Sequence, residues 1–173
     1  GVGAGLEAVG IDYPRPVRTL RESITVIRSL LDGETVGFAG ETVRLEPSRL
    51  VRPTERRPPL VIGTRSPAVM RLAGEVADRV LVGARYLSPE LAATYRVRLS
   101  DGAERAGRDA NLIEVAPRLT LCVSENGEAA RASVKRYVAH YVSLLRPTEL
   151  GLDPDWLDEV DAALDRSKGW YFD

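Results

Sequence analysis

The stretch Gly63-Thr64-Arg65-Ser66-Pro67 combines residue types that can hold an anion. Ser66 can cap a helix and Pro67 suits the first helical position, while the free N–H groups of a first turn carry partial positive charge. Gly63 lets the backbone approach a ligand, Thr64 adds a hydroxyl, and Arg65 adds a permanent cation. The spacing therefore predicts either a site for a phosphate or carboxylate or an ordinary Ser-Pro helix start.

A second glycine-rich stretch, GVGAG, opens the chain. Its glycines at positions 1, 3 and 5 permit positive φ angles and leave room for a planar ring or a phosphate against the backbone. The spacing differs from the dinucleotide-binding fingerprint, and tight packing of a strand against the following helix is the alternative interpretation. Ser88-Pro89 repeats the helix-start signal without a glycine, so we interpret it as structural.

The other reactive side chains are few. Cys122 lies in the apolar run LTLCVS, which favours a buried core thiol over a nucleophile because no histidine lies nearby in the sequence. His140, the only histidine, falls in a helical stretch and is interpreted as a satisfied or solvent-facing imidazole. The sequence shows no metal-site signature, and no nucleophile with a nearby base can be named, so the catalytic residues stay unassigned.

Two segments are rich in charge. Residues 46–59 form a predicted loop with four arginines that could meet a polyanion, although a solvated loop is the default: Arg49, Arg52, Arg56 and Arg57. The acids of residues 153–165 recur around an apolar stripe, which is typical of a solvated helix face.

The whole composition is that of one soluble globular domain. Of the 173 residues, 44% are hydrophobic and 28% charged, which excludes disordered, collagen-like and membrane-spanning classes. The net charge of −1 gives no global attraction for nucleic acid or an anionic membrane, so neither is expected as a partner. A single cysteine and the lack of a signal core predict a cytoplasmic protein. The start without Met and the aromatic end, GWYFD, lead us to expect a piece of a longer polypeptide.

The elements that must position these residues follow from periodicity. Apolar residues at three- and four-residue steps, such as Leu20, Ile24 and Ile27, predict amphipathic helices over 15–32, 67–77, 88–107, 126–145 and from 153 onward. Apolar runs predict strands over 59–63, 78–84 and 113–124, the last edge-like or irregular in its first part because of Pro117, and a hairpin near 35–45. This alternation predicts an α/β fold of parallel βαβ units, either doubly wound or part of a barrel, in one domain over 1–173.

Three stretches in their order resemble the luciferase-like monooxygenase superfamily, especially the branch that uses the deazaflavin coenzyme F-420. They are GVGAG, then LEAVGIDYPRPVRTLRESITVIRSLLDGETVGFAGETVRL, then PPLVIGTRSPAVMRLAGEVADRVLVGA. Members are similar in their glycine turn, their helix ending in Gly-Glu, their Phe-x-Gly hairpin and their strand leading to an LAGE phrase. The resemblance covers about residues 1 to 125.

The resemblance implies a (β/α)8 TIM barrel of which this chain covers about strands 4 to 7, with the seventh in RLTLCVS. It implies F-420 at the carboxyl face of the barrel, and hydride transfer to or from a small organic substrate. Either of two glycine-rich sets would hold the coenzyme phosphate: Gly3, Ala4 and Gly5, or Gly63, Thr64, Arg65 and Ser66. The family's acid/base residues lie largely on the first strands, outside the matched region.

Two alternatives to F-420 chemistry stay open. The first is a monooxygenase that uses FMN, reduced flavin and oxygen. The second is a non-catalytic half-barrel that binds a ligand or dimerises through its exposed strand edges, and we expect a homo-oligomer in any case.

Overall fold

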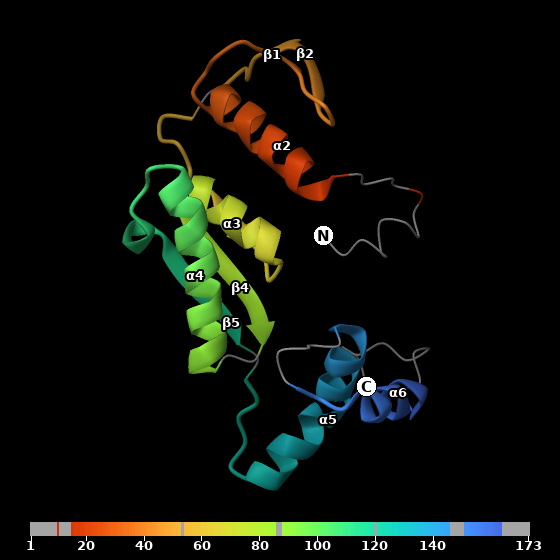
Figure 1. Cartoon of the computed structure of the whole chain (residues 1–173). Coiled ribbons are helices and arrows are strands. Elements are labelled where there is room, and N and C mark those ends of the chain that lie inside the picture. The colour runs from red at the N-terminus through yellow and green to blue at the C-terminus, as the bar shows by residue number, and fades with distance from the viewer. Residues whose placement is uncertain are drawn as a thin grey trace. The chain divides into compact units, whose positions relative to one another are not determined.

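The computed structural model describes residues 10, 15–52, 54–85, 88–119, 121–145 and 151–163 (Figure 1). The chain forms two compact units, residues 1–118 and 119–173, which are described separately. Within the first unit lie one long helix with a hairpin, then a small sheet with its covering helices. That the whole chain is one partial domain stays a prediction.

Helix α2 (Pro16–Leu31) and the β1–β2 hairpin form the first part of unit 1. The helix predicted over 15–32 begins at Pro16 and ends at Leu31, and Gly33 follows its end with a φ of 81°. Strands β1 (Val36–Ala39) and β2 (Arg44–Ser48) pair antiparallel, as expected. The predicted loop from residue 46 begins only after Ser48, because Pro47 is tolerated in a strand that has a single partner.

A three-stranded sheet in the order β3-β4-β5 forms the centre of unit 1. Strands β3 (Val61–Gly63) and β4 (Arg79–Arg85) are parallel, with Val61 opposite Arg79 and Gly63 opposite Leu81. Helices α3 (Pro67–Val76) and α4 (Pro89–Arg105) connect the strands, and a short 3-10 turn, η1 (Ala110–Leu112), precedes β5 (Glu114–Leu119). The predicted βαβ arrangement is confirmed.

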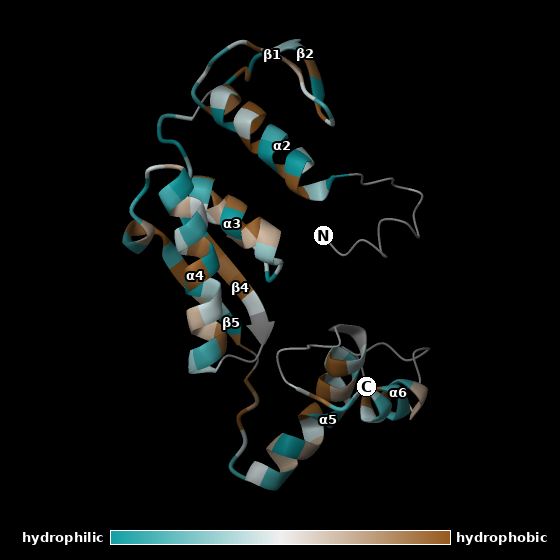
Figure 2. Cartoon of the chain, in the orientation of Figure 1, coloured by the Kyte–Doolittle hydropathy of each residue, from teal (hydrophilic) through white to brown (hydrophobic). Residues whose placement is uncertain are grey.

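Helices α3 and α4 cover one face of the sheet (Figure 1). The apolar bands on these helices and on β4 stand out in Figure 2. The buried core joins strand residues to helix residues: Ile62, Val80 and Val82 with Met70, Ala73, Tyr95, Leu99 and Ala103. Burial of these side chains is the main favourable contribution to the fold of unit 1.

The two covering helices touch through their backbones. A Cβ atom added to Gly74 on α3 would overlap the carbonyl oxygen of Leu99, and one added to Gly102 on α4 would overlap the carbonyl oxygen of Arg71. The Arg108 guanidinium then donates to the carbonyls of Gly74 and Ala77, both at 2.8 Å. These bonds satisfy carbonyls at the end of α3 that have no partner within the helix.

Strand β5 differs from its prediction. The regular strand is the first part of the expected stretch and includes Pro117, whereas residues 121–124 form no strand. The side chains of Leu121 and Val123 are 83% and 93% exposed. An apolar run becomes a strand only where a neighbouring strand accepts its hydrogen bonds, and the described residues offer none there. The seventh barrel strand assigned to RLTLCVS is therefore shifted toward the start of the stretch.

Unit 2 contains two helices, α5 (Gly127–Leu145) and α6 (Pro154–Ala163). Val142 and Leu157 are buried, and the Ser143 hydroxyl of α5 bonds the Asp161 carboxylate of α6. The rings of Tyr137 and Tyr141 stack with centroids 6.3 Å apart. Both helices were expected from the sequence, and the residues after 163 lie outside the described part of the chain. In the part of the chain that the structure describes, no helix is long and apolar enough to cross a membrane.

Candidate functional site

The β3–α3 loop forms a fixed turn at the carboxyl end of β3. The Thr64 N–H donates to the carbonyl of Leu81 on β4 at 3.0 Å, which ties the loop to the neighbouring strand. The Ser66 N–H donates to the Thr64 hydroxyl at 3.0 Å, and the Val69 N–H approaches the Ser66 hydroxyl at 3.5 Å. The predicted Ser66 cap and Pro67 at the first turn of α3 are confirmed. Internal hydrogen bonds thus hold the loop in shape.

This loop has donors that fit an anion. The Thr64 and Ser66 hydroxyls accept bonds inside the loop, and each still has its own proton to donate. The Ala68 N–H lies in the first helical turn, where the helix dipole favours negative charge. Arg65 is half-buried beside them. A phosphate or carboxylate would therefore find hydroxyl, amide and guanidinium donors within the five residues 64–68.

Gly63 is not required by the fold itself. A Cβ atom at this position would meet only the Leu81 carbonyl oxygen, at 4.0 Å, and the φ angle of Gly63 is not positive. The glycine therefore leaves open space at the carboxyl end of β3, as a close ligand approach needs.

The second predicted set, Gly3, Ala4 and Gly5, lies outside the described residues. Of the seven predicted coenzyme-binding residues, the structure places Gly63, Thr64, Arg65 and Ser66 together in one turn. The carboxyl end of a parallel strand is where ligands bind in α/β folds.

Charged side chains mark the other end of the same sheet. The Arg79 Nε lies 2.7 Å from the Glu114 Oε2, and the Glu114 N–H donates to the Asp78 carbonyl at 3.1 Å. This pair joins the first residues of β4 and β5. A charged residue at the start of each of two apolar runs is the only sequence signal for the pair, and the register that brings the two together comes from the Glu114–Asp78 backbone bond.

Sequence reasoning missed Glu22, a buried carboxylate on α2. It accepts bonds from the backbone N–H groups of Glu41, Thr42 and Val43 at 3.0 to 3.1 Å, and from the Thr42 hydroxyl at 2.9 Å. These donors lower the pKa of Glu22 to about 2. The largest cause is the bond from the Thr42 N–H, which outweighs the opposing effect of burial. Glu22 is structural, and its contacts join residues 20 positions apart, so no local pattern announces it.

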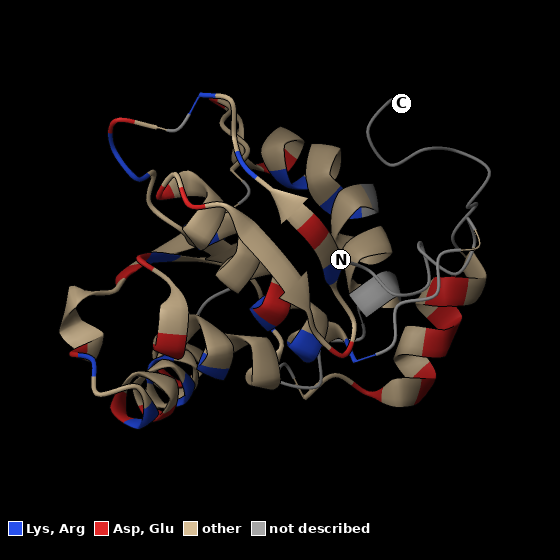
Figure 3. Cartoon of the chain, turned by 90° about the horizontal axis from the view of Figure 1, so that it is seen from above, with Lys and Arg blue, Asp and Glu red and all other residues tan. Residues whose placement is uncertain are grey.

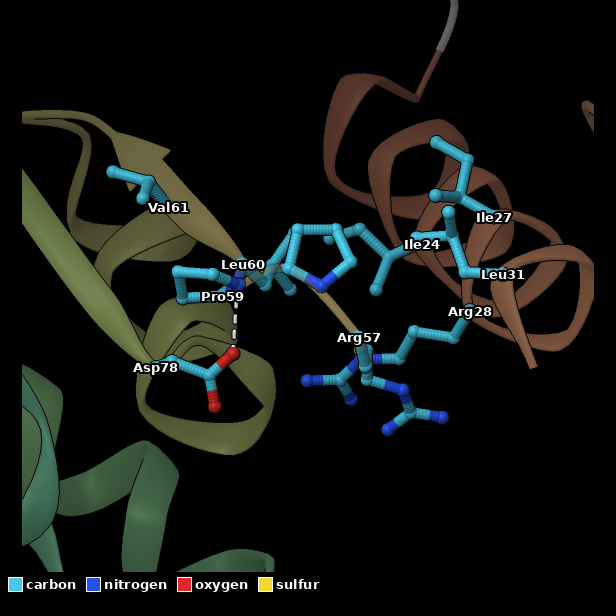
Figure 4. Close-up of a pocket in the computed structure, with 10 residues that line it drawn as sticks. Ile24, Ile27, Arg28, Leu31, Arg57, Pro59, Leu60, Val61 and Asp78 are labelled. Carbon is cyan, nitrogen blue, oxygen red and sulfur yellow. Dashed lines mark hydrogen bonds between the residues drawn. The ribbon is translucent and has the colours of Figure 1, made fainter. Parts of the chain in front are cut away.

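An apolar hollow of about 170 Å³ lies at the amino end of β3 (Figure 4). Its walls come from α2 and from the segment before β3, and they include Ile24, Ile27, Leu31, Pro58, Pro59 and Leu60. Asp78 accepts from the Leu60 N–H at 2.7 Å, as the dashed line in Figure 4 shows. The hollow lies at the opposite end of β3 from the Gly63–Ser66 turn and is separate from the predicted anion site.

The arginine-rich loop beside this hollow is partly paired. Arg57 binds Asp32 through two bonds, one of them from Nε at 2.9 Å, and the hydrogen bond to Asp32 raises the pKa of Arg57. The Arg28 guanidinium donates to the Val76 carbonyl. In Figure 3, basic and acidic residues alternate along the ribbons. One ion pair joins the Arg21 Nη1 to the Glu75 Oε2 at 2.5 Å. The two bonds from Arg57 to Asp32, the residue that caps the end of α2, fasten the loop to this helix.

The remaining reactive residues lie in unit 2. Cys122 is exposed rather than buried, because the strand expected over its residues does not form; its Sγ lies 3.1 Å from the Ser133 hydroxyl. The prediction of a core thiol is therefore wrong. His140 is half-buried on α5. Among the described residues, no group of three His, Cys, Asp or Glu side chains could hold a metal ion.

The fold and this loop agree with a family assignment. The chain belongs to the luciferase-like monooxygenase family, whose model matches residues 1–168. A 5,10-methylenetetrahydromethanopterin reductase of Archaeoglobus fulgidus is 28% identical over 175 residues, covering 96% of this chain and 52% of the relative. The same enzyme of Methanolobus tindarius is 29% identical over 167 residues, covering 95% and 50%. An F-420-dependent glucose-6-phosphate dehydrogenase of Nakamurella multipartita is 28% identical over 144 residues, covering 80% and 42%.

Solved structures show the same architecture. The coenzyme F-420-dependent tetrahydromethanopterin reductase of Methanopyrus kandleri matches with a TM-score of 0.67 and 25% identity over 82% of this chain and 45% of that one. An F-420-dependent secondary alcohol dehydrogenase matches with a TM-score of 0.69 and 21% identity over 92% and 48%. These neighbours are TIM barrels, so the α/β fold is part of such a barrel. The chain spans about half the length of the relatives that it matches.

Proposed function

We propose that this chain is the coenzyme-anchoring part of an oxidoreductase that uses F-420 for hydride transfer to or from a small organic substrate. The observation that carries the proposal is the likeness to F-420-dependent relatives across most of the chain. F-420 supplies the hydride chemistry when it is bound.

The residues of the β3–α3 turn would hold the coenzyme phosphate. Thr64 and Ser66 would donate from their hydroxyls, and Arg65 would balance the charge. Gly63 would let the backbone come close to the ligand, since its position is open. These residues anchor and orient, because none of them forms a nucleophile–base pair that could carry a reaction.

The test is a fluorescence titration of the chain with F-420. Replacing Gly63 with Val fills the open position, and we expect at least about tenfold weaker coenzyme binding, equal to about 1.4 kcal/mol. Thermal stability should hardly change, since the new side chain meets no close neighbour. Gly37→Ala on the hairpin is the matched control, because its Cβ would make only ordinary contact with Pro47. If Gly63→Val, like the control, keeps the native affinity for F-420, the phosphate site would instead be assigned to Gly3, Ala4 and Gly5.

Two other functions give different results in the same titration. FMN binding without F-420 binding would favour a flavin monooxygenase, in line with the word monooxygenase in the family's name. A folded chain that binds neither coenzyme would favour a non-catalytic half-barrel. In each case we further propose a homo-oligomer, since β3 and β5 end the described sheet and offer strand edges for pairing. We also propose a cytoplasmic location, because a single cysteine fits a reducing compartment.

A further inference from the structure

The sheet of unit 1 has two unlike faces. Ile62, Val80 and Val82 point under α3 and α4 and are buried. Val61 and Leu81 alternate with them, point the other way, and are 51% and 39% exposed. We call this second face the inner face, because a closed barrel turns it toward its axis.

The inner face can be followed from strand to strand. Val61 is opposite Arg79, and Arg79 pairs with Glu114, so all three stand on the inner face. The N–H bond from Glu114 to the Asp78 carbonyl fixes the alignment of β5 with β4. Alternation along β5 then puts Ala116 and Arg118 on the same face, with Arg118 level with Gly83.

The carboxyl end of this face combines open space with the cation of Arg118. A Cβ atom at Gly83 would meet nothing within 4 Å, and one at Gly63 would meet only the Leu81 carbonyl. At the amino end, the charge of Arg79 is balanced by Glu114. Arg118 forms no ion pair within the described residues, and its side chain is exposed. The face is therefore neutral at one end and positive at the end where ligands bind in this fold.

We propose that Arg118 is a specificity-determining residue that binds an oxyanion of the substrate, a carboxylate or a phosphate, over the floor formed by Gly63 and Gly83. A guanidinium suits this role because it donates two parallel bonds to such a group. That this oxyanion belongs to a substrate rests on the proposed function. The oxyanion site itself is a property of this face.

The experiment is a backbone amide NMR titration of the chain with inorganic phosphate and, separately, with acetate. We expect saturable shifts at Gly83 and Ala116. Arg118→Gln should weaken this binding about tenfold or more, because it removes a charge-assisted bond. Arg118→Lys should restore part of it, since a point charge replaces a planar fork. The matched control is Arg96→Gln, an exposed arginine on α4, the helix that covers the opposite face.

The outcomes separate the two proposals. Loss of oxyanion binding in Arg118→Gln alone supports the site, and the ion that binds tells whether the substrate carries a phosphate or a carboxylate. Unchanged binding in that variant, or shifts confined to residues 64–68, overturns it. An F-420 titration of the same variants is independent: we expect Arg118→Gln to keep its coenzyme affinity. A chain that binds oxyanion through Arg118 but no coenzyme would retain this site and refute the proposed function.

Discussion

At the scale of single residues, one carboxylate holds the β1–β2 turn to α2. Glu22 accepts three backbone N–H bonds and one hydroxyl bond from residues 41–43, and a side chain at Gly40 would overlap this carboxylate. The turn has a glycine because the carboxylate fills the space. The ionised form of Glu22 is favoured by these donors, which lowers its pKa to about 2.

Replacing Glu22 with Gln should change the pH dependence of stability. The pKa of Glu22 lies below its ordinary 4.5 only in the folded state, so ionised Glu22 stabilises the protein above that pH. This contribution is lost as the pH falls toward 2. Urea unfolding from about pH 7 down to about pH 2.5 should show a steeper acid loss for the native chain than for Glu22→Gln. The control, exposed Glu104→Gln on α4, should keep the native slope, and a native slope in both variants would refute the role of Glu22.

At the scale of elements, the α3–α4 contact depends on two glycines. Gly74 and Gly102 let the backbones of the two helices approach until side-chain atoms have no room. Arg108 then closes the end of α3 by bonding two of its carbonyls. This contact fixes the carboxyl half of α3 against α4.

Gly74→Ala or Gly102→Ala should destabilise unit 1 although alanine is the better helix former. The added methyl group meets backbone atoms that cannot move aside, and overpacking of this kind costs about 1–3 kcal/mol. Chemical denaturation measures the loss. Gly127→Ala at the start of α5 is the control, since its Cβ would meet only an Arg131 side-chain nitrogen at 3.6 Å and should cost nothing. Equal stability of all the variants would contradict the close crossing.

At the scale of the whole molecule, the two units are separated at residue 118. The first is built on a sheet covered on one face, and within the described residues its inner face remains open at Val61 and Leu81. The relatives are about twice as long as the chain, and a closed barrel buries such a face. Residues 121–124, near the start of the second unit, have neither helix nor strand.

Limited chymotrypsin digestion should cut after Leu121 early. The Leu121 side chain is exposed and its backbone belongs to no regular element, which is where proteases nick folded chains. Mass spectrometry should find a persistent fragment that contains unit 1 up to this residue. Leu112 is the internal control, because it is also exposed but its N–H is bonded within the 3-10 turn. Cleavage at Leu112 before Leu121 would contradict the division into two units.

Much of the fold, and the Gly63–Ser66 turn of the candidate site, could be predicted from patterns of neighbouring residues. The ends of α2 and α3 follow from Pro16, Gly33, Ser66 and Pro67, since caps act on neighbouring residues. Cys122 was predicted wrongly because burial depends on distant partners. The Arg79–Glu114 pair and the Glu22 contacts were missed for the same reason.

The sequence by itself determined where helices and strands form, the α/β class, and the turn that gathers Gly63, Thr64, Arg65 and Ser66. Those features depend on periodicity and on hydrogen bonds within a few residues. Only the tertiary structure decided which part of residues 113–124 pairs as a strand, which carboxylate is buried, and which side chains share the inner face. Those features depend on contacts between residues far apart in the chain, whose geometry no local pattern contains.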